Sequence, residues 1–205
     1  MKIQINNKSY EISEVVSVIK TFLIIDPSYE NYDCPTISKE NWLEDCISLA
    51  NKGMRARISW KKVKLGLDRD RIKELIDKVP QKVTLEDCDE EALRNLDILF
   101  SYFIQVKGFA NATITKFLHK RFPELIPIVD SLVGKVYFAD KYRRSNIDSL
   151  MNVIEAIRKD FIKNEPELEK IRMELEKQEI SLTTLRIFDI FLWIKGNENS
   201  GFLFG

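Results

Sequence analysis

The side chain best placed for chemistry in this sequence is the carboxylate of Asp130. It follows the apolar segment Pro127-Ile128-Val129 and precedes Ser131-Leu132-Val133, so it stands where an apolar run gives way to a helix. A fixed carboxylate can stabilise positive charge in a transition state and can orient or deprotonate a water molecule. The same position also suits a helix N-cap, which needs no chemistry. The two roles are compatible, and the residue types alone leave both open.

A glycine turn with basic neighbours lies 22 residues before this aspartate, at Gly108. Glycine allows the positive-φ backbone that a tight joint between two helices needs. We expect the second helix to start at Asn111, as its N-cap, with first-turn N–H groups that face outward without partners. Such a helix start attracts phosphate, and Lys107 and Lys116 add positive charge nearby. A glycine corner between two helices is also common without any ligand.

The charges are segregated along the chain, although 32 basic and 32 acidic residues give a net charge of zero. Two segments, 51–66 and 107–123, are basic and contain no acidic residue, whereas the acidic residues gather in 86–91 and 165–179. This distribution is compatible with one basic face that binds nucleic acid, and also with ordinary solvated helix faces.

The spacing from the glycine turn to the aspartate resembles that of the helix-hairpin-helix DNA glycosylases. Their pattern is an LPGVGxKTA-like hairpin, an apolar segment and a catalytic aspartate in VD-T/S-x-V. The corresponding stretches here are VKGFANATI, residues 106–114, and IPIVDSLV, residues 126–133. The resemblance covers about 30 residues, and it departs from the pattern at Ala110, where the family has its second hairpin glycine.

This resemblance implies a DNA glycosylase that hydrolyses the N-glycosidic bond of a damaged or modified base flipped out of double-stranded DNA. Asp130 would be the catalytic residue. Ala112 stands where bifunctional members carry a Schiff-base lysine, which implies a monofunctional enzyme that leaves an abasic site. The four-cysteine iron–sulfur cluster of some relatives has no counterpart. We expect no cofactor, apart from a structural monovalent cation that the hairpin could hold.

The predicted DNA-binding residues combine the hairpin with nearby cationic side chains. They are Lys107, Gly108, Ala110, Thr113, Lys116, Arg55, Arg57, Lys61, Lys62, Lys64, Arg143 and Arg144.

The composition predicts a mainly α fold: 44% hydrophobic and 31% charged residues with only 7 Gly and 6 Pro. We expect a single two-lobed helical domain over 1–205, with the motif and catalytic segment at 106–137 and a β-hairpin around Asn6-Asn7. No signal peptide or membrane-spanning run is recognisable, so the chain is expected to be cytoplasmic. We also expect it to be a monomer. Cys34, Cys46 and Cys88 lack metal-site spacing and are read as ordinary thiols.

The pattern of apolar residues, caps and breakers predicts the individual helices. They fall at 14–24, 60–65, 68–79, 87–106, 130–140, 147–163, 166–178 and 184–195. One more helix is expected between Ser38, as its N-cap, and Gly53, as its C-terminal cap. His119 is expected to face solvent. Arg186, Asp189 and Trp193 on the last helix are read as part of a packing face.

Two other function classes compete with the glycosylase. One is a catalytically inactive helix-hairpin-helix module that binds nucleic acid, and the other is a helical interaction or adaptor protein in which Asp130 is only a cap. A helix-turn-helix regulator fits less well, because no polar base-reading face follows the turn. The sequence leaves the identity of the excised base open among alkylated purines, deaminated bases and the bulky modified pyrimidines of phage DNA. A substrate of the last kind would indicate a role in phage defence.

Overall fold

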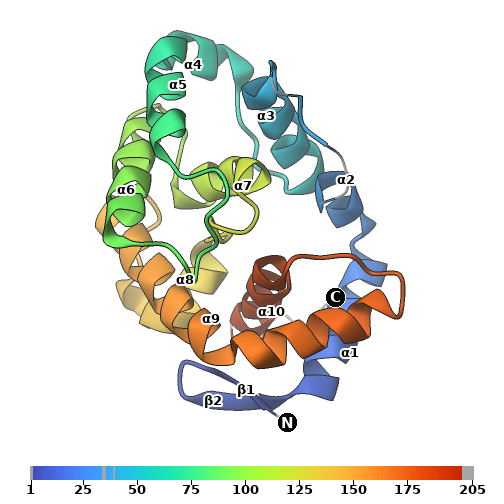
Figure 1. The fold of residues 1–205 in the computed structure, drawn as a ribbon. Coiled ribbons are helices and arrows are strands. Elements are labelled where there is room, and N and C mark those ends of the chain that lie inside the picture. Colours follow the sequence, from blue (N-terminus) through green and yellow to red (C-terminus); the bar gives the residue numbers. More distant parts are fainter. Residues whose placement is uncertain (1, 34–35, 39, 200–205) are drawn as a thin grey trace.

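The computed structural model describes residues 2–33, 36–38 and 40–199, and this part of the chain is mainly helical (Figure 1). The elements, in chain order, are β1 (Lys2–Ile5), β2 (Lys8–Glu11), α1 (Ile12–Ile25), the short η1 (Pro27–Tyr29) and α2 (Glu30–Asp33), α3 (Trp42–Gly53), α4 (Trp60–Gly66), α5 (Arg69–Lys78), α6 (Glu90–Ile104), α7 (Asn111–Arg121), α8 (Ser131–Phe138), η2 (Ala139–Lys141), α9 (Ile147–Glu176) and α10 (Thr184–Asn199). The predicted mainly α class is confirmed, and no described helix is long and apolar enough to cross a membrane.

The predicted N-terminal hairpin is confirmed. β1 and β2 pair antiparallel, and Asn6 and Asn7 form the turn with φ values of 44° and 65°. Ile3 and Ile5 are buried, and the side chain of Asn164 on α9 donates to the carbonyl of Gln4 (2.6 Å) and accepts from its N–H (2.7 Å). The hairpin is therefore fastened to the longest helix.

The expected break before Pro166 is wrong, because α9 runs without interruption from Ile147 to Glu176. Proline removes one helical hydrogen bond, that to the carbonyl four residues earlier. Pro166 and Ile162 are both exposed, so water can satisfy that carbonyl. Phe161 and Leu168 are buried on either side and hold both halves of the helix against the same core.

The joint between α6 and α7 has the tight geometry that the glycine predicted. Gly108 has a φ of 99°, a conformation that glycine adopts without steric cost. Three aromatic rings fill the inside of the joint: Phe103 lies 6.0 Å from Phe109 and 4.8 Å from Phe117, between ring centroids. This cluster fixes the angle at which α7 leaves the turn.

The expected role of Asn111 as an N-cap is wrong, because the cap position belongs to Ala110 and Asn111 is the first helical residue. Its buried amide instead donates to the Tyr142 hydroxyl (3.1 Å) and to the carbonyl oxygens of Arg143 (3.0 Å) and Asn146 (3.2 Å). Its own backbone N–H donates to the carbonyl of Arg144 at 2.9 Å. A distant loop therefore occupies one of the N–H groups that were expected to face solvent.

The predicted ends of α3 are also wrong. Asn41 occupies the N-cap position, while the hydroxyl of Ser38 accepts from the N–H of Asn41 at 3.0 Å. Gly53 is the last residue inside the helix, and a methyl group there would lie 2.5 Å from Cβ of Tyr32. Gly53 is thus required for close packing and not for a left-handed cap.

Cys46 and Cys88 are buried free thiols, whereas Cys34 lies outside the described residues. Burial raises the pKa of Cys46 to about 12, so this thiol is neutral and unreactive at ordinary pH.

Helix α10 lies directly against α8, and both pack on α9 in the lower half of Figure 1. The closest approach is at Gly196, where a methyl group would lie 2.6 Å from the carbonyl oxygen of Leu132. This contact sets the distance between the helix that carries Trp193 and the helix that Asp130 begins.

We predict that Gly196→Ala lowers the free energy of unfolding by about 1–3 kcal/mol, because the added methyl group must displace backbone. Urea denaturation measures this change. Gly66→Ala serves as the control, because its methyl group would meet only the Val106 side chain, at 3.2 Å, and we expect a smaller effect. Equal stability of the two variants would contradict the packing role of Gly196.

Candidate active site around Asp130

Asp130 is the N-cap of α8 and also one wall of a small cavity. Its Oδ1 accepts from the N–H groups of Leu132 (2.8 Å) and Val133 (3.1 Å), and its Oδ2 accepts from Nε1 of Trp193 (3.1 Å). The capping role is therefore present in the structure. The indole holds the second oxygen in a defined direction, which is the preorganisation that a catalytic carboxylate needs.

The cavity beside this carboxylate has a volume of about 20 Å³, enough for about one water molecule. Aromatic, apolar and charged side chains from separate parts of the chain line it. They are Phe22, Tyr29, Met54, Lys116, Ile128, Asp130, Arg186, Asp189, Ile190 and Trp193. Phe22, Tyr29 and Trp193 form its aromatic walls.

Lys116, a predicted DNA contact, projects from α7 into this cavity. Its Nζ donates to the carbonyl oxygen of Met54 at 3.0 Å. Burial lowers the pKa of Lys116, while the negative charge of Asp130 raises it and the positive charges of Arg186 and Arg55 lower it further. Ala112, one turn earlier on the same face, offers no amine. Lys116 thus supplies an amine close to the carboxylate, with its protonated form destabilised.

A buried ion-pair network lies behind the cavity and centres on Arg186. Its Nε donates to Asp33 and its Nη1 to Asp189, each at 2.9 Å, and its guanidinium carbon lies 4.9 Å from the ring centre of Tyr29. The Arg186 and Asp189 side chains are only 4% and 1% exposed, so neither charge is stabilised by water. Each depends on the other for its place in the interior.

Asp189 connects this network to the segment that ends at Asp130. Its Oδ2 accepts from the backbone N–H of Ile128 at 3.2 Å. The pKa of Asp189 is raised, because the effect of burial exceeds the opposing effects of the Arg186 guanidinium charge and the Ile128 N–H.

His119 was expected to face solvent, and this expectation is wrong. The ring is buried between α7 and the network, with Nδ1 2.6 Å from the carbonyl oxygen of Ile126 and 3.9 Å from Asp189 Oδ2. Its pKa is lowered from 6.5 to about 3, first by burial and then by the charge of Arg186. A neutral ring that donates from Nδ1 to the carbonyl fits these contacts.

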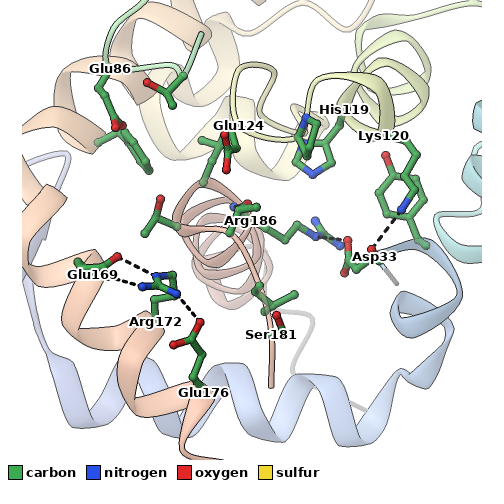
Figure 2. Close-up of a pocket in the computed structure, with 18 residues that line it drawn as sticks. Asp33, Glu86, His119, Lys120, Glu124, Glu169, Arg172, Glu176, Ser181 and Arg186 are labelled. Carbon is green, nitrogen blue, oxygen red and sulfur yellow. Dashed lines mark hydrogen bonds and ion pairs between the residues drawn. The ribbon is translucent and has the colours of Figure 1, made fainter. Parts of the chain in front are cut away.

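A second, larger cavity of about 570 Å³ lies on the other side of Arg186. Figure 2 shows Arg186 reaching from α10 toward Asp33, with Lys120 and His119 above and the Arg172 cluster below. The acidic side chains Glu86, Glu124, Glu169 and Glu176 outnumber the cations along its walls. Arg186 thus lines both the predominantly acidic cavity and the Asp130 cavity. In the described part of the chain, no group of three or more His, Cys, Asp or Glu residues is placed to hold a metal ion.

The structure brings several of the predicted DNA-binding residues to the hairpin. Nζ of Lys62 lies 3.3 Å from the position of a Gly108 Cβ, and Gly66 lies beside Val106, so α4 packs along the turn. The loop with Arg143 and Arg144 covers the start of α7, as the Asn111 contacts show.

The remaining predicted contacts are spread around these elements. Lys61, Lys64, Lys107, Arg55 and Arg57 are exposed, and Arg55 also lies 3.5 Å from Asp26. Ala110 and Thr113 are half-buried at the joint.

The polar residues of the last helix belong to the site, although their pattern was interpreted as a packing face. Arg186, Asp189 and Trp193 stand at i, i+3 and i+7, which places them on one helical face. A packing face with a charged pair in an otherwise apolar helix indicates a buried polar network. All three residues line the Asp130 cavity.

Most of the chain matches one known family. Residues 49–196 match the family described as a family of unknown function (DUF6308), and the chain belongs to that family. No curated protein and no solved structure matches the chain. The matched region contains α4, the glycine joint, Asp130 and Arg186, whereas the cavity residues Phe22 and Tyr29 precede it.

We predict that Arg186→Ala destabilises the protein by about 3–5 kcal/mol, because it leaves the buried carboxylate of Asp189 and the half-buried carboxylate of Asp33 without a counter-charge. Arg172→Ala is a matched control, since Arg172 also pairs with two acidic residues, Glu169 and Glu176, but at the surface. We expect the control to cost at most about 1 kcal/mol. Similar urea midpoints for the two variants would show that the Arg186 network contributes no more stability than an ion-pair cluster at the surface.

The buried histidine predicts a specific pH dependence. Above pH 6.5, His119 is neutral in both the folded and the unfolded state and contributes nothing. Below that value the unfolded chain takes up the proton first, so the free energy of unfolding falls by up to about 1.4 kcal/mol per pH unit.

The measurement is the free energy of unfolding in urea between pH 7 and pH 4, compared between wild type and His119→Gln. The amide of glutamine can still donate to the carbonyl of Ile126 but does not titrate in this range, so the variant should lose stability less steeply. Parallel curves would show that His119 is not the group responsible.

Proposed function

We propose that this protein is a DNA glycosylase that binds duplex DNA through the Gly108 joint and uses Asp130 to release a flipped base. The observation that carries the proposal is the arrangement of these two features: a positive-φ glycine joint among basic side chains, followed by a held carboxylate in a cavity with aromatic walls. The resemblance over residues 106–133 supports the same assignment.

Asp130 would act on the charge that develops on the sugar. Breaking an N-glycosidic bond creates an oxocarbenium-like transition state, and a carboxylate nearby stabilises it electrostatically. At ~4 Å and an effective dielectric constant of about 20, the attraction is on the order of 4 kcal/mol, which corresponds to roughly a thousandfold in rate. The same carboxylate can orient the attacking water.

The reaction requires the cavity to open, because about 20 Å³ cannot hold a base. The side chains of Met54 and Trp193, which contact Arg186 and Asp130, form walls that would have to rotate away. Movement of Trp193 would also free Oδ2 of Asp130 for a water molecule.

A DNA-binding protein without catalysis is the second candidate, and one observation favours it. Both carboxylate oxygens of Asp130 already accept hydrogen bonds, from the start of α8 and from Trp193. This arrangement satisfies a structural cap completely.

We predict that the protein releases bases from DNA that carries alkylated, deaminated or hypermodified bases, with strand breaks after hot alkali. Asp130→Asn should lower release by at least about a hundredfold, because asparagine caps α8 as well as aspartate does but carries no charge. Asp68→Asn is the control, since Asp68 also accepts from two N–H groups as the N-cap of α5. We expect the control to keep full activity.

The other outcomes separate the alternatives. Strand breaks without alkali, together with a covalent protein–DNA adduct after borohydride reduction, would indicate a Schiff base. If both are lost in Lys116→Met, Lys116 is the amine that forms it, and the monofunctional assignment is replaced. Tight binding at low salt without release from any pool would leave the binding protein. No affinity for DNA would leave the interaction or adaptor protein.

A further inference from the structure

Helix α4 presents the most exposed large hydrophobic side chain in the described part of the chain. Leu65 is 80% exposed, although an exposed leucine gains nothing in stability. Only one residue of the helix, Val63, is buried against the rest of the protein. The outer face of α4 is therefore free to meet a partner.

The surroundings of Leu65 are strongly basic. Lys61, Lys62 and Lys64 are exposed on the same helix, and none of them forms an ion pair with a described residue. Nζ of Lys64 lies 5.5 Å from the ring centre of Trp60. The sequence contains no acidic residue between Asp45 and Asp68. A single large apolar side chain surrounded by exposed lysines is suited to a partner that is polyanionic outside and apolar inside.

The position of α4 links it to the glycine joint. Gly66 at its end lies against Val106, with 3.2 Å between the site of a Cβ and the valine methyl group, and Lys62 reaches Gly108. Leu65 therefore projects from a helix that is fixed beside the turn proposed to hold a DNA strand. It is one residue from the contact with Val106.

We propose that α4 is a DNA-contacting element in which Lys61, Lys62 and Lys64 neutralise phosphates and Leu65 inserts between base pairs of the duplex. Apolar wedges of this kind unstack a base step and bend the DNA, while cationic side chains beside them hold the backbone. The proposal rests on the proposed function for its partner, DNA, and adds the residue that distorts the duplex.

DNA fits this surface better than a lipid membrane. A helix that lies in a membrane surface presents a continuous apolar face. Helix α4 is only 7 residues long, and among its long aliphatic side chains Leu65 alone is exposed while Val63 is buried. A single leucine flanked by lysines matches the size of one opened base step.

The test uses the full-length protein and duplexes with 2-aminopurine beside an abasic site, a lesion that weakens local stacking. Insertion of Leu65 should raise the 2-aminopurine fluorescence on binding. Leu65→Ala should abolish most of this rise. It should also weaken binding by about tenfold, because less apolar surface is removed from water when the complex forms. Its salt dependence should stay that of the wild type, since no charge is altered.

Two other variants complete the design. Ile24→Ala is the matched control, because Ile24 is 77% exposed but lies on α1, at the opposite end of the molecule from α4 (Figure 1). It should behave like the wild type. Replacing Lys61, Lys62 and Lys64 together by Glu should reduce the slope of log affinity against log salt by about 3.

Failure of this inference is distinguishable from failure of the proposed function. If Leu65→Ala binds and brightens the duplex as the wild type does, the wedge is wrong, while base release can still depend on Asp130. If the wild type does not bind DNA at low salt, both proposals are wrong. Binding to anionic phosphatidylserine vesicles that is lost in Leu65→Ala, without DNA binding, would assign α4 to a membrane surface instead.

Discussion

The arrangement of the candidate site depends on one buried cation, the guanidinium of Arg186. A charge in the interior is costly unless its partners are in place, so this arginine requires Asp33 and Asp189 at hydrogen-bonding distance. Those partners belong to different parts of the chain: α2 near the N-terminus and α10 near the C-terminus. The requirement therefore ties the two ends of the described chain together around one point.

The same network supports a segment that has no regular structure of its own. Residues 126–129 are buried, and their backbone groups need partners that neither a helix nor a sheet supplies. Side chains provide them: Asp189 accepts from Ile128, the hydroxyl of Thr115 accepts from Val129 at 3.1 Å, and His119 contacts the carbonyl of Ile126. Asp130 follows this segment directly. Its position is thus set by α7 and α10, two helices that are far apart in the sequence.

The features that local sequence determines were predictable. Alternation around Asn6-Asn7 specified the β-hairpin, and the glycine at 108 specified a tight joint, because backbone conformation there depends on the residue itself. The role of Asp130 as a cap followed from its place before an apolar helix.

The features that tertiary contacts determine were not predictable from local sequence. Asn111 and His119 are polar residues on a helix, and nothing nearby in the sequence shows that a distant loop binds Asn111 or that His119 is buried. The continuity of α9 through Pro166 depends on buried neighbours, which outweigh the loss of one hydrogen bond. The position of Lys116 is a similar case: its charge suggested a surface contact, whereas the fold places it in the cavity.

The size of the Asp130 cavity constrains the order of events in the proposed reaction. A base cannot enter about 20 Å³, so DNA must first bind elsewhere and supply free energy for opening. The exposed lysines of α4 and Lys107 lie outside the cavity and can make phosphate contacts before it opens. The backbone of Met54, whose side chain lines the cavity, continues into Arg55 and Arg57, which both have positive φ values, 51° and 57°. Non-glycine residues in that conformation are strained by about 1–3 kcal/mol each. Under the proposed function, phosphate contacts to these two arginines would act on the segment that carries the cavity wall, and binding at the surface would then be coupled to access at Asp130.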